Sequence, residues 1–309
     1  MNSDIYEVII VGGGPAGLTA GLYSSRAGLT SCLIEKGIFG GQITYAERVE
    51  NFTGFPEGIS GLELGEKMHE QARKHGLKTL AAEVTGLEIR GALKIIKTTE
   101  GDYAGKVVIM AGGAVRRKLG VEGESRLTGR GVSYCAVCDG AFFRDQKVAV
   151  VGGGDTAITE ALHLAKFASK ITIIHRRNQF RAGHILQEKL QSEPKIDFLW
   201  DTTVSAIEGT DMVEGIKLLN VKTGQRSIME VSGVFVSVGT NPDTDYVKGI
   251  LPLDESGYII TNEKMETPIP GVLAAGDIRH NSARQAITAA GDGATAAIYA
   301  QKYLTESTA

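Results

Sequence analysis

Cys135 and Cys138 are separated by two residues and followed directly by Asp139. Two cysteines at this spacing either help to bind a metal ion or cycle between a dithiol and a disulfide. The spacing commonly lowers the pKa of one thiol below about 8.5, which populates the thiolate that attacks a disulfide or a flavin. Asp139 is placed to protonate a departing thiolate, although an aspartate here also suits a turn or a helix cap. These residues predict a two-electron redox centre with Cys135, Cys138 and Asp139 as its catalytic groups.

Zinc binding is the alternative for this cysteine pair. A structural zinc site needs about four ligands, whereas no histidine lies close in sequence to the pair and the only other cysteine, Cys32, falls within a predicted strand. We interpret Cys32 as a small buried apolar residue. Three cysteines in 309 residues also exclude a disulfide-stabilised scaffold. We therefore expect no metal site and a cytoplasmic location.

A glycine-rich motif follows the apolar segment Tyr6–Val11. It reads Gly12-x-Gly14-x-x-Gly17, continues into a helix of small residues, and is followed by a second strand, residues 31–34, that ends at Glu35. In such a unit the first glycine permits a tight turn, the second lets the backbone approach a pyrophosphate, and the third lets the helix pack on the strand. The helix N-terminus then stabilises the anion.

The same unit recurs 140 positions further along the chain. Residues 147–151 read as a strand, Gly152-x-Gly154-x-x-Ala157 begins a helix, and a strand over residues 171–174 ends at His175. One such motif occurs in many α/β proteins. Two copies whose flanking elements keep the same offset indicate two dinucleotide-binding βαβ units.

The residues after the second strand differ between the two units. Glu35 accepts hydrogen bonds from ribose hydroxyls and repels a 2′-phosphate, which suits FAD or NAD. His175 stands at the matching position and is followed by Arg176, Arg177 and Arg181. Three guanidiniums near one ribose favour a 2′-phosphate and therefore NADPH, whereas the alternative is a solvated basic face.

Two nucleotide sites and one cysteine pair together predict a chain of electron carriers. A nicotinamide does not readily transfer a hydride directly to a disulfide. A flavin, which accepts the hydride and passes the electron pair to sulfur, is the usual intermediary. We therefore expect a flavin to pass electrons from NADPH, bound by the second unit, to the cysteine pair.

Two late strands, residues 106–110 and 233–238, each run into a glycine turn and close the two units. Residues 272–275 form a further strand, and an Ala-rich helix follows from about Ala283 to Tyr303. The predicted fold class is α/β, with two Rossmann-like dinucleotide-binding domains, the second inserted into the first. The expected boundaries are 1–117 and 244–309 for the discontinuous first domain, which the resemblance described below implies is FAD-binding, and 118–243 for an NADPH-binding domain that carries the cysteine pair.

The overall composition is that of a globular enzyme. Hydrophobic residues make up 42%, charged residues 22%, and the net charge is -3, which argues against nucleic acid as a partner. No apolar stretch reaches the roughly 18 residues needed to cross a bilayer. Residues 1–11 hold no basic residue before their apolar run. We therefore expect neither a membrane span nor a secretion signal.

The motifs together resemble the low-molecular-weight thioredoxin reductases, the bacterial and archaeal type within the pyridine nucleotide-disulfide oxidoreductases. The resemblance runs from about residue 5 to residue 303, and its most specific element is the CxxCD motif between the two glycine-rich motifs. Ala111-Gly112-Gly113 departs from the Ala-Thr-Gly common in the family, and Val137 replaces a common threonine; neither weakens the resemblance. The residues that carry it are Gly12-Gly13-Gly14-Pro15-Ala16-Gly17, Gly40-Gly41-Gln42, 49–56, 135–140, Gly152-Gly153-Gly154-Asp155-Thr156-Ala157, His175-Arg176-Arg177 with Arg181, and Ala275-Gly276-Asp277 with Arg284-Gln285-Ala286.

This resemblance implies FAD and NADPH as cofactors, a homodimer, thioredoxin as the protein substrate, and Cys138 as the cysteine nearer the flavin. It implies FAD contacts at Gly12, Gly14, Pro15, Ala16, Gly17, Glu35, Gly41, Gln42, Asn51, Val84, Ala111, Gly112, Asp277, Arg284, Gln285 and Ala286. It implies NADPH contacts at Gly152, Gly154, Asp155, Thr156, Ala157, His175, Arg176, Arg177 and Arg181.

Three other functions stay open from the sequence. The partner is another disulfide protein, glutaredoxin-like or peroxiredoxin-linked; or the enzyme passes single electrons to ferredoxin or a quinone; or the chain is a nucleotide sensor with a zinc clip. The cysteine pair and the nicotinamide site lie in one domain, and both must reach a flavin held by the other. We therefore also expect the domains to rotate about the segments near residues 115–120 and 240–246.

Overall fold

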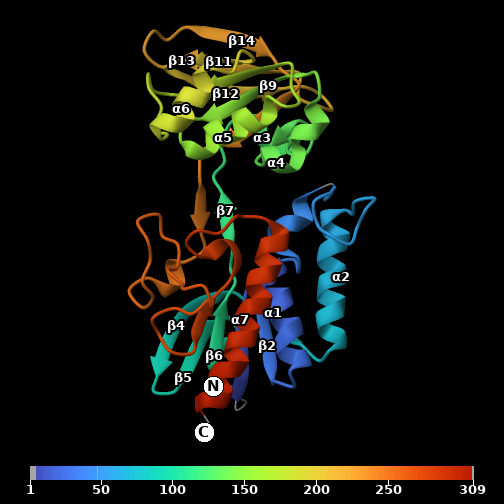
Figure 1. Ribbon diagram of the computed structural model, residues 1–309, viewed down its shortest axis with the longest axis vertical. Helices are drawn as coiled ribbons and strands as arrows, with labels where there is room; N and C mark the ends of the chain where they lie inside the picture. Colours follow the sequence, from blue (N-terminus) through green and yellow to red (C-terminus); the bar gives the residue numbers. More distant parts are fainter. Residues whose placement is uncertain (1–4, 47, 308–309) are drawn as a thin grey trace. The chain divides into compact units, whose positions relative to one another are not determined.

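The computed structural model of the protein describes residues 5–46 and 48–307 (Figure 1). The chain forms two compact units: the first runs to Val115 and resumes at Asn241, and the second spans Arg116–Thr240. The connecting segments, β7 (Ala114–Arg116) and β16 (Thr240–Pro242), pair with each other as a two-stranded sheet. Residues 1–4 and 308–309, at the ends of the expected FAD-binding domain, and Glu47 lie outside the described residues.

The first unit is built on one mixed sheet. Its strands are β1 (Ile5–Val11), β2 (Ser31–Glu35), β3 (Lys78–Ala81), β4 (Val84–Arg90), β5 (Leu93–Thr98), β6 (Gly101–Met110) and β17 (Val272–Ala274). The strand order is β3-β2-β1-β6-β5-β4, with β17 also beside β6. β1, β2, β3, β6 and β17 are parallel, which explains why β1 is almost continuously apolar. β6 begins five residues before the predicted strand because its first half pairs antiparallel with β5.

Among its described residues this unit has three helices: α1 (Pro15–Arg26), α2 (Gly61–Lys74) and α7 (Ala286–Ser307). α7 packs against α1 (Figure 1). The contact is close because a Cβ atom added at Gly293 would collide with the carbonyl oxygen of Ala16. α7 starts three residues later than predicted, since Arg284 has a left-handed φ of 56° that a helix does not tolerate. Short 3-10 turns complete the unit: η1 (Gly41–Tyr45), η3 (Asp245–Val247) and η4 (Gly276–Ile278).

The second unit repeats the nucleotide-binding arrangement. Its parallel sheet has the order β11-β10-β9-β15-β8, formed by β8 (Val132–Ser133), β9 (Lys147–Gly152), β10 (Lys170–Ile174), β11 (Ile196–Leu199) and β15 (Gly233–Ser237). α5 (Asp155–Leu164) connects β9 to β10. The neighbours of β9 therefore match those of β1, which lies between β2 and β6 in the first unit. This match confirms the predicted α/β fold with two Rossmann-like domains, the second inserted into the first.

The remaining elements of the second unit were not predicted. β12 (Thr202–Glu208), β13 (Gly215–Asn220) and β14 (Arg226–Glu230) form a separate antiparallel sheet. Its inner residues pack with β15 and Leu127 in one of the two cores of this unit. The helices and turns are α3 (Glu124–Leu127), α4 (Ala136–Asp139), η2 (Gly140–Phe143) and α6 (His184–Gln191).

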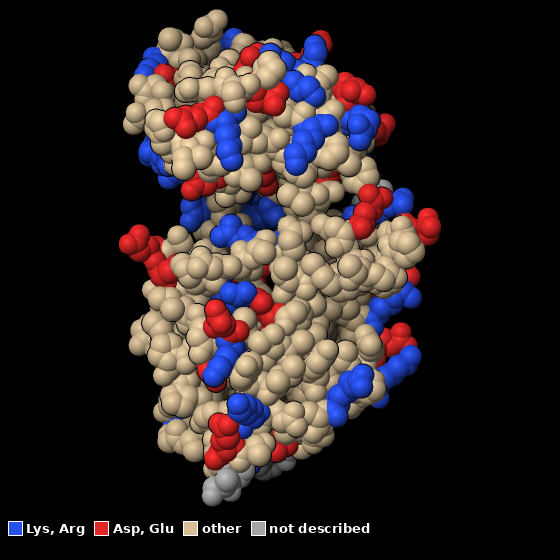
Figure 2. Space-filling model, in the orientation of Figure 1, with Lys and Arg blue, Asp and Glu red and all other residues tan. Residues whose placement is uncertain are grey.

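Charged side chains of both signs lie on the face of each unit that Figure 2 draws. On the face drawn in Figure 2, lysine and arginine side chains alternate with aspartate and glutamate rather than forming a field of one sign. This distribution agrees with the small net charge of -3. Within the part of the chain that the structure describes, no helix combines the length and apolarity needed to cross a membrane.

Candidate active site and cofactor-binding loops

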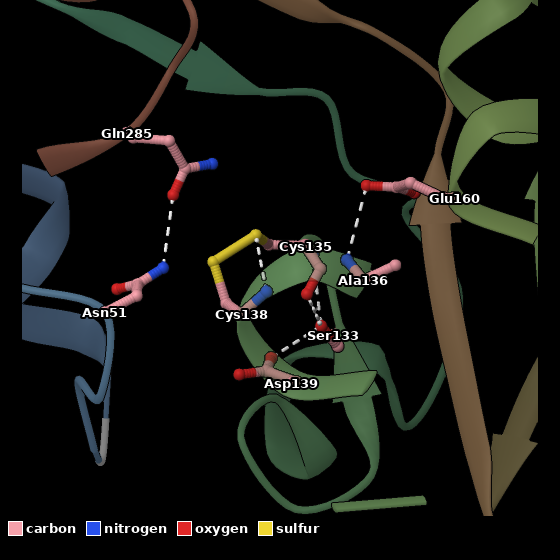
Figure 3. The surroundings of a disulfide bond; sticks show 8 residues. All are labelled: Asn51, Ser133, Cys135, Ala136, Cys138, Asp139, Glu160 and Gln285. Atoms are coloured by element: carbon pink, nitrogen blue, oxygen red, sulfur yellow. Dashed lines mark hydrogen bonds between the residues drawn. A yellow bond between two sulfur atoms is a disulfide. The ribbon is translucent and has the colours of Figure 1, made fainter. Parts of the chain in front are cut away.

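Cys135 and Cys138 form a disulfide at the start of α4, with Cα atoms 5.3 Å apart (Figure 3). Cys135 immediately precedes the helix, and its Sγ atom accepts a hydrogen bond from the backbone N–H of Cys138 at 3.2 Å. The backbone N–H of Cys135 donates to Oγ of Ser133 at 3.1 Å. The turn that holds both sulfurs is thus fixed by the backbone around it, and the bond between them is the oxidised form of the expected redox centre.

Asp139 lies at the end of the same short helix. Its Oδ2 atom accepts a hydrogen bond from Oγ of Ser133 at 2.6 Å (Figure 3). Burial raises the pKa of Asp139, while the Ser133 hydrogen bond and the charge of Arg116 act in the opposite direction. Asp139 occupies the position before the turn η2, but its side chain makes no capping hydrogen bond there. A carboxyl with a raised pKa beside two sulfurs suits a general acid.

Glu160 is a second carboxyl near the disulfide, and the sequence analysis missed it. The residue is only 9% exposed, and burial raises its pKa. Its Oε1 atom accepts a hydrogen bond from the backbone N–H of Ala136 at 3.4 Å, and its Oε2 atom accepts one from Oγ of Ser237. The signal was present in the helical period: Glu160 stands three residues after Ala157 and four before Leu164, both buried.

The first glycine-rich loop has the geometry of a phosphate-binding turn. Gly12 has a φ of 105°, and a Cβ atom there would collide with the carbonyl group of Ala111. A Cβ atom at Gly17 would collide with the carbonyl oxygen of Gly12, so the helix lies directly on the turn. Gly14 caps α1 without a side-chain hydrogen bond, and a Cβ atom there would meet nothing within 4 Å. Open space therefore remains in front of the free N–H groups of the helix.

Glu35 closes one side of this loop. Its Oε2 atom accepts a hydrogen bond from the N–H of Gly13 at 2.6 Å, and its Oε1 atom accepts one from the N–H of Gly37 at 2.7 Å. Gly41 approaches from the other side, since its Cβ atom would lie 3.0 Å from Cα of Gly14. The structure thus brings Glu35 and Gly41, two of the expected FAD contacts, to the loop.

Asp277 reaches the same loop from the C-terminal part of the chain. It lies in η4, and a Cβ atom at the preceding Gly276 would come within 2.9 Å of Cβ of Ala16. Asp292 on α7 fixes this turn: it accepts the N–H of Gly276 at 3.1 Å and forms two hydrogen bonds with Arg279, at 2.6 and 2.9 Å. This buried clamp was not predicted, because it depends on how α7 packs against η4.

For the other expected FAD contacts the structure gives a few side-chain interactions and otherwise the element in which each residue lies. Nδ2 of Asn51 donates to Oε1 of Gln285 at 3.3 Å, just before α7, and the guanidinium of Arg284 lies 5.2 Å from the centre of the Tyr258 ring. Ala111 and Gly112 lie against Gly12. The remaining residues are placed by their elements: Gln42 in η1, Val84 at the start of β4, Pro15 and Ala16 at the start of α1, and Ala286 at the start of α7.

The second glycine-rich loop repeats the same features. Gly154 caps α5 without a side-chain hydrogen bond, and a Cβ atom there would meet nothing within 4 Å. At Gly152, with a φ of 159°, a Cβ atom would lie 2.7 Å from Cβ of Ala157. Asp155 accepts the N–H of Gly183 at 2.8 Å, and Thr156 follows it on α5. The second unit therefore also offers open space in front of a helix N-terminus.

His175 lies over this second loop. It is 6% exposed, its ring would collide with a Cβ atom at Gly153, and its Nε2 atom has no hydrogen-bond partner among the described residues. Burial lowers its pKa, and the charges of Arg181, Arg177 and Arg176 lower it further. All three arginines are exposed. The structure therefore gathers the three expected phosphate-binding side chains near one histidine at the edge of the loop.

Cys32 is fully buried in β2, and burial raises the pKa of its thiol to about 11. This confirms that it is a small core residue. Among residues 5–46 and 48–307 no group of three or more His, Cys, Asp or Glu side chains is arranged to hold a metal ion. The disulfide already uses both sulfurs of the pair that a zinc site would need.

The residues present fit two dinucleotides. Each unit has one helix N-terminus with uncapped N–H groups facing space that only a glycine leaves open, at Gly14 and at Gly154. These are the features that bind a pyrophosphate. A carboxylate stands beside the first loop at Glu35, which suits ribose hydroxyls, and cations stand beside the second, which suits a phosphate.

Comparisons with known proteins extend this fit to the whole chain. The family of pyridine nucleotide-disulphide oxidoreductases matches residues 6–293. The thioredoxin reductase of Bacillus subtilis (strain 168) is 46% identical over 303 residues, which cover 98% of this chain and 96% of that protein. The thioredoxin reductase of Peptoclostridium acidaminophilum is 44% identical over 307 residues, covering 97% of this chain and 98% of that protein. The crystal structure of thioredoxin reductase from Streptococcus pyogenes MGAS5005 has a TM-score of 0.94 and 46% identity, covering 98% of this chain and 99% of that one.

Proposed function

Because the chain belongs to the family of pyridine nucleotide-disulphide oxidoreductases, we propose that it is a thioredoxin reductase that uses NADPH and FAD to reduce its Cys135–Cys138 disulfide. The family uses a flavin and a pyridine nucleotide. The dithiol so formed reduces the disulfide of thioredoxin. The relatives at 44% to 46% identity bear the name of this activity and cover both units of the chain.

The disulfide is the observation that carries this proposal. It lies between the two glycine-rich motifs, in the same unit as the arginine-bearing nucleotide loop. When bound, a flavin supplies the two-electron chemistry that links a reduced nicotinamide to sulfur. Two electrons and two protons convert the disulfide to two thiols. One thiolate then attacks the disulfide of thioredoxin, and the second sulfur displaces reduced thioredoxin and restores the bond between Cys135 and Cys138.

Asp139 supplies and accepts the proton in this cycle. Burial raises its pKa, which makes the carboxyl a better proton carrier near neutral pH, and Ser133 holds Oδ2 in place from the backbone turn that also carries Cys135. A sulfur that is protonated as it departs is a better leaving group than one that departs as a thiolate. A proton donated by Asp139 therefore lowers the barrier to opening the disulfide. We assign Asp139 as the general acid and base of the two cysteines.

The first unit is assigned to FAD and the second to NADPH. Glu35 at the first loop disfavours a 2′-phosphate by charge, whereas Arg176, Arg177 and Arg181 favour one at the second. Replacing the three arginines by alanine is expected to raise KM for NADPH far more than KM for NADH. Arg226→Ala, an exposed arginine on β14 of the same unit, is the matched control and leaves both constants unchanged. Equal effects on both nucleotides would contradict the assignment.

Reoxidation of the reduced enzyme identifies the protein substrate. Anaerobically reduced enzyme is mixed in a stopped-flow instrument with oxidised thioredoxin, a glutaredoxin or a peroxiredoxin-type protein, and the return of flavin absorbance is followed. Fastest reoxidation by thioredoxin supports the proposal. If another of these proteins reoxidises the enzyme faster, that protein is the substrate and the proposal of thioredoxin is contradicted.

We also propose a cytoplasmic homodimer. The first unit exposes the large apolar side chains of Ile38 and Tyr45, which are 61% and 74% exposed and which a second copy would cover. A reducing compartment suits an enzyme with only three cysteines that works as a dithiol. Sedimentation at micromolar concentration tests the assembly, with a mass of two chains expected and the mass of one chain contradicting it.

A further inference from the structure

The three arginines proposed to bind the 2′-phosphate lie in a loop without regular secondary structure. The loop joins β10 to α6, and its arginine side chains are exposed. Like charges gathered at one place repel each other, and long flexible side chains lose entropy when a ligand fixes them. A site of this kind binds phosphate well only if the backbone that carries the arginines is held in place beforehand. The structure shows what holds it.

Backbone hydrogen bonds fix the loop at two points. The carbonyl of Arg177 accepts the N–H of Asp201 at 3.2 Å, and the N–H of Arg181 donates to the carbonyl of Gly153 at 2.8 Å. Arg181 is thereby tied to the glycine-rich loop, whereas Arg177 is tied to the turn between β11 and β12. The spacing of the two arginines therefore depends on where that turn lies.

Side chains join the loop to the same turn. Phe180, between the two anchored arginines, has its ring centre 4.5 Å from that of Trp200 and 5.6 Å from that of Phe198. Trp200 lies 5.7 Å from Phe198 and 6.3 Å from His175. We call Phe180, Phe198 and Trp200 the aromatic platform. Aromatic pairs at these separations attract each other beyond the area they bury.

The turn beneath the platform is itself braced. Asp201 has a left-handed φ of 50°, which a non-glycine residue keeps only where its surroundings enforce it. Its carbonyl accepts the N–H of Val221 at 2.7 Å, and its carboxylate lies 3.0 Å from Nζ of Lys222. The residue next to Trp200 is thus fixed to the end of β13, and the platform rests on a rigid support.

Trp200 is also placed at the edge of the unit rather than in its core. Phe180 and Phe198 pack against a buried core of the second unit, whereas Trp200 is half-buried and is not among the residues of either of its cores. Its ring contacts are with His175 and the two phenylalanines. Removing this ring therefore takes support from the loop while leaving the core intact.

We propose that Trp200, through the aromatic platform, positions Arg177 and Arg181 and so sets the preference of the enzyme for a nucleotide with a 2′-phosphate. Trp200 is a positioning residue, because it acts through the loop rather than on the nucleotide. The proposal rests on the assignment of NADPH to the second unit. It predicts that a change at Trp200 affects only ligands that carry the 2′-phosphate.

Two ligands that differ in this one group test the proposal. Titration calorimetry on the FAD-loaded enzyme compares adenosine 2′,5′-bisphosphate with adenosine 5′-monophosphate. Trp200→Ala is expected to weaken binding of the bisphosphate by about two- to twelvefold, the equivalent of one aromatic pair, and to leave the monophosphate unchanged. Trp200→Phe keeps a ring and stays close to wild type. Phe167→Leu is the matched control, because Phe167 precedes β10 while the loop follows it.

Equal weakening of both ligands by Trp200→Ala, or no weakening of either, overturns the proposal. Should this variant fail to fold, Phe180→Leu replaces it with the same expectations. As the only tryptophan in the chain, Trp200 also reports directly: its emission should change with the bisphosphate and not with the monophosphate. Wild-type enzyme that binds both ligands equally would instead contradict the NADPH assignment, so the two failures are distinguishable.

Discussion

Replacing Asp139 by asparagine should separate proton transfer from structure. The asparagine side chain still accepts the hydrogen bond from Oγ of Ser133, which is 2.6 Å from Oδ2 in the wild type. It has no proton to give to a departing thiolate. General acids and bases contribute about 10² to 10⁴ in rate. We therefore expect reoxidation of the reduced enzyme by thioredoxin to slow at least about a hundredfold, while reduction of the flavin by NADPH proceeds at the wild-type rate.

Although Asp139→Asn should lose activity, its folded state should be at least as stable as that of the wild type. Because burial raises the folded-state pKa of Asp139 above its unfolded value, this group contributes stability below the unfolded pKa, about 3.9, and loses that contribution as the pH rises through the folded pKa. At pH 7.5 the wild type therefore holds either a proton or an unfavourable buried charge. Asparagine carries neither, so the variant should melt at or above the wild-type temperature, and its stability should fall less as the pH rises from 4.

The assay is a pair of anaerobic stopped-flow measurements, one for each half of the cycle, together with a melting curve. Asp145→Asn is the control, since Asp145 is an exposed aspartate of the same unit with a left-handed φ of 60° that asparagine also tolerates. A general acid contributes at least about a hundredfold in rate. If thioredoxin reoxidises Asp139→Asn within about threefold of the wild-type rate, Asp139 is not the general acid. The proton would then come from another buried carboxyl such as Glu160.

Three further outcomes follow from the structure. Gly14→Ala should fold with wild-type stability, since a Cβ atom there meets nothing within 4 Å, but should lose FAD during purification; Gly12→Ala should be destabilised, because its φ is 105° and its Cβ atom would collide with a carbonyl. After reduction, two thiols per chain should react quickly with a thiol reagent at pH 7, and Cys32 only on unfolding, because burial raises its pKa to about 11; three fast thiols would contradict this. A crosslink that holds the two units in one orientation should abolish turnover, and full activity in the crosslinked enzyme would refute the expected rotation.

Local chemistry made the nucleotide-binding units predictable. The strand, glycine turn and helix of each unit can be recognised within about 30 residues, and the contact of Gly17 with the carbonyl oxygen of Gly12 lies inside that window. The same holds for Glu35, which bonds to the loop directly beside its own strand. The close approach of Gly12 to Ala111 is a contact that the motif does not reveal. The second glycine-rich motif and its flanking strands follow the first at a constant offset of 140 residues, so the second unit could be predicted from the first.

Contacts that depend on how helices pack against turns were beyond the sequence analysis. The clamp of Asp292 on Arg279 depends on how α7 crosses η4, and the hydrogen bonds of Glu160 depend on how α5 lies under the disulfide. The antiparallel strands β12 to β14 pair with their neighbours in sequence but were missed, because their alternation of apolar residues is short. The start of α7 was placed too early, since an Ala-rich sequence does not reveal the left-handed residue Arg284.

The passage of electrons through Cys135 and Cys138 is the central claim, and a Cys138→Ser variant tests it most directly. Under anaerobic conditions NADPH should bleach the flavin of this variant as it does in the wild type, because the nucleotide sites are untouched. Oxidised thioredoxin should then restore the flavin absorbance of the wild type within one turnover and leave that of the variant bleached. A variant that thioredoxin reoxidises at the wild-type rate would contradict the account.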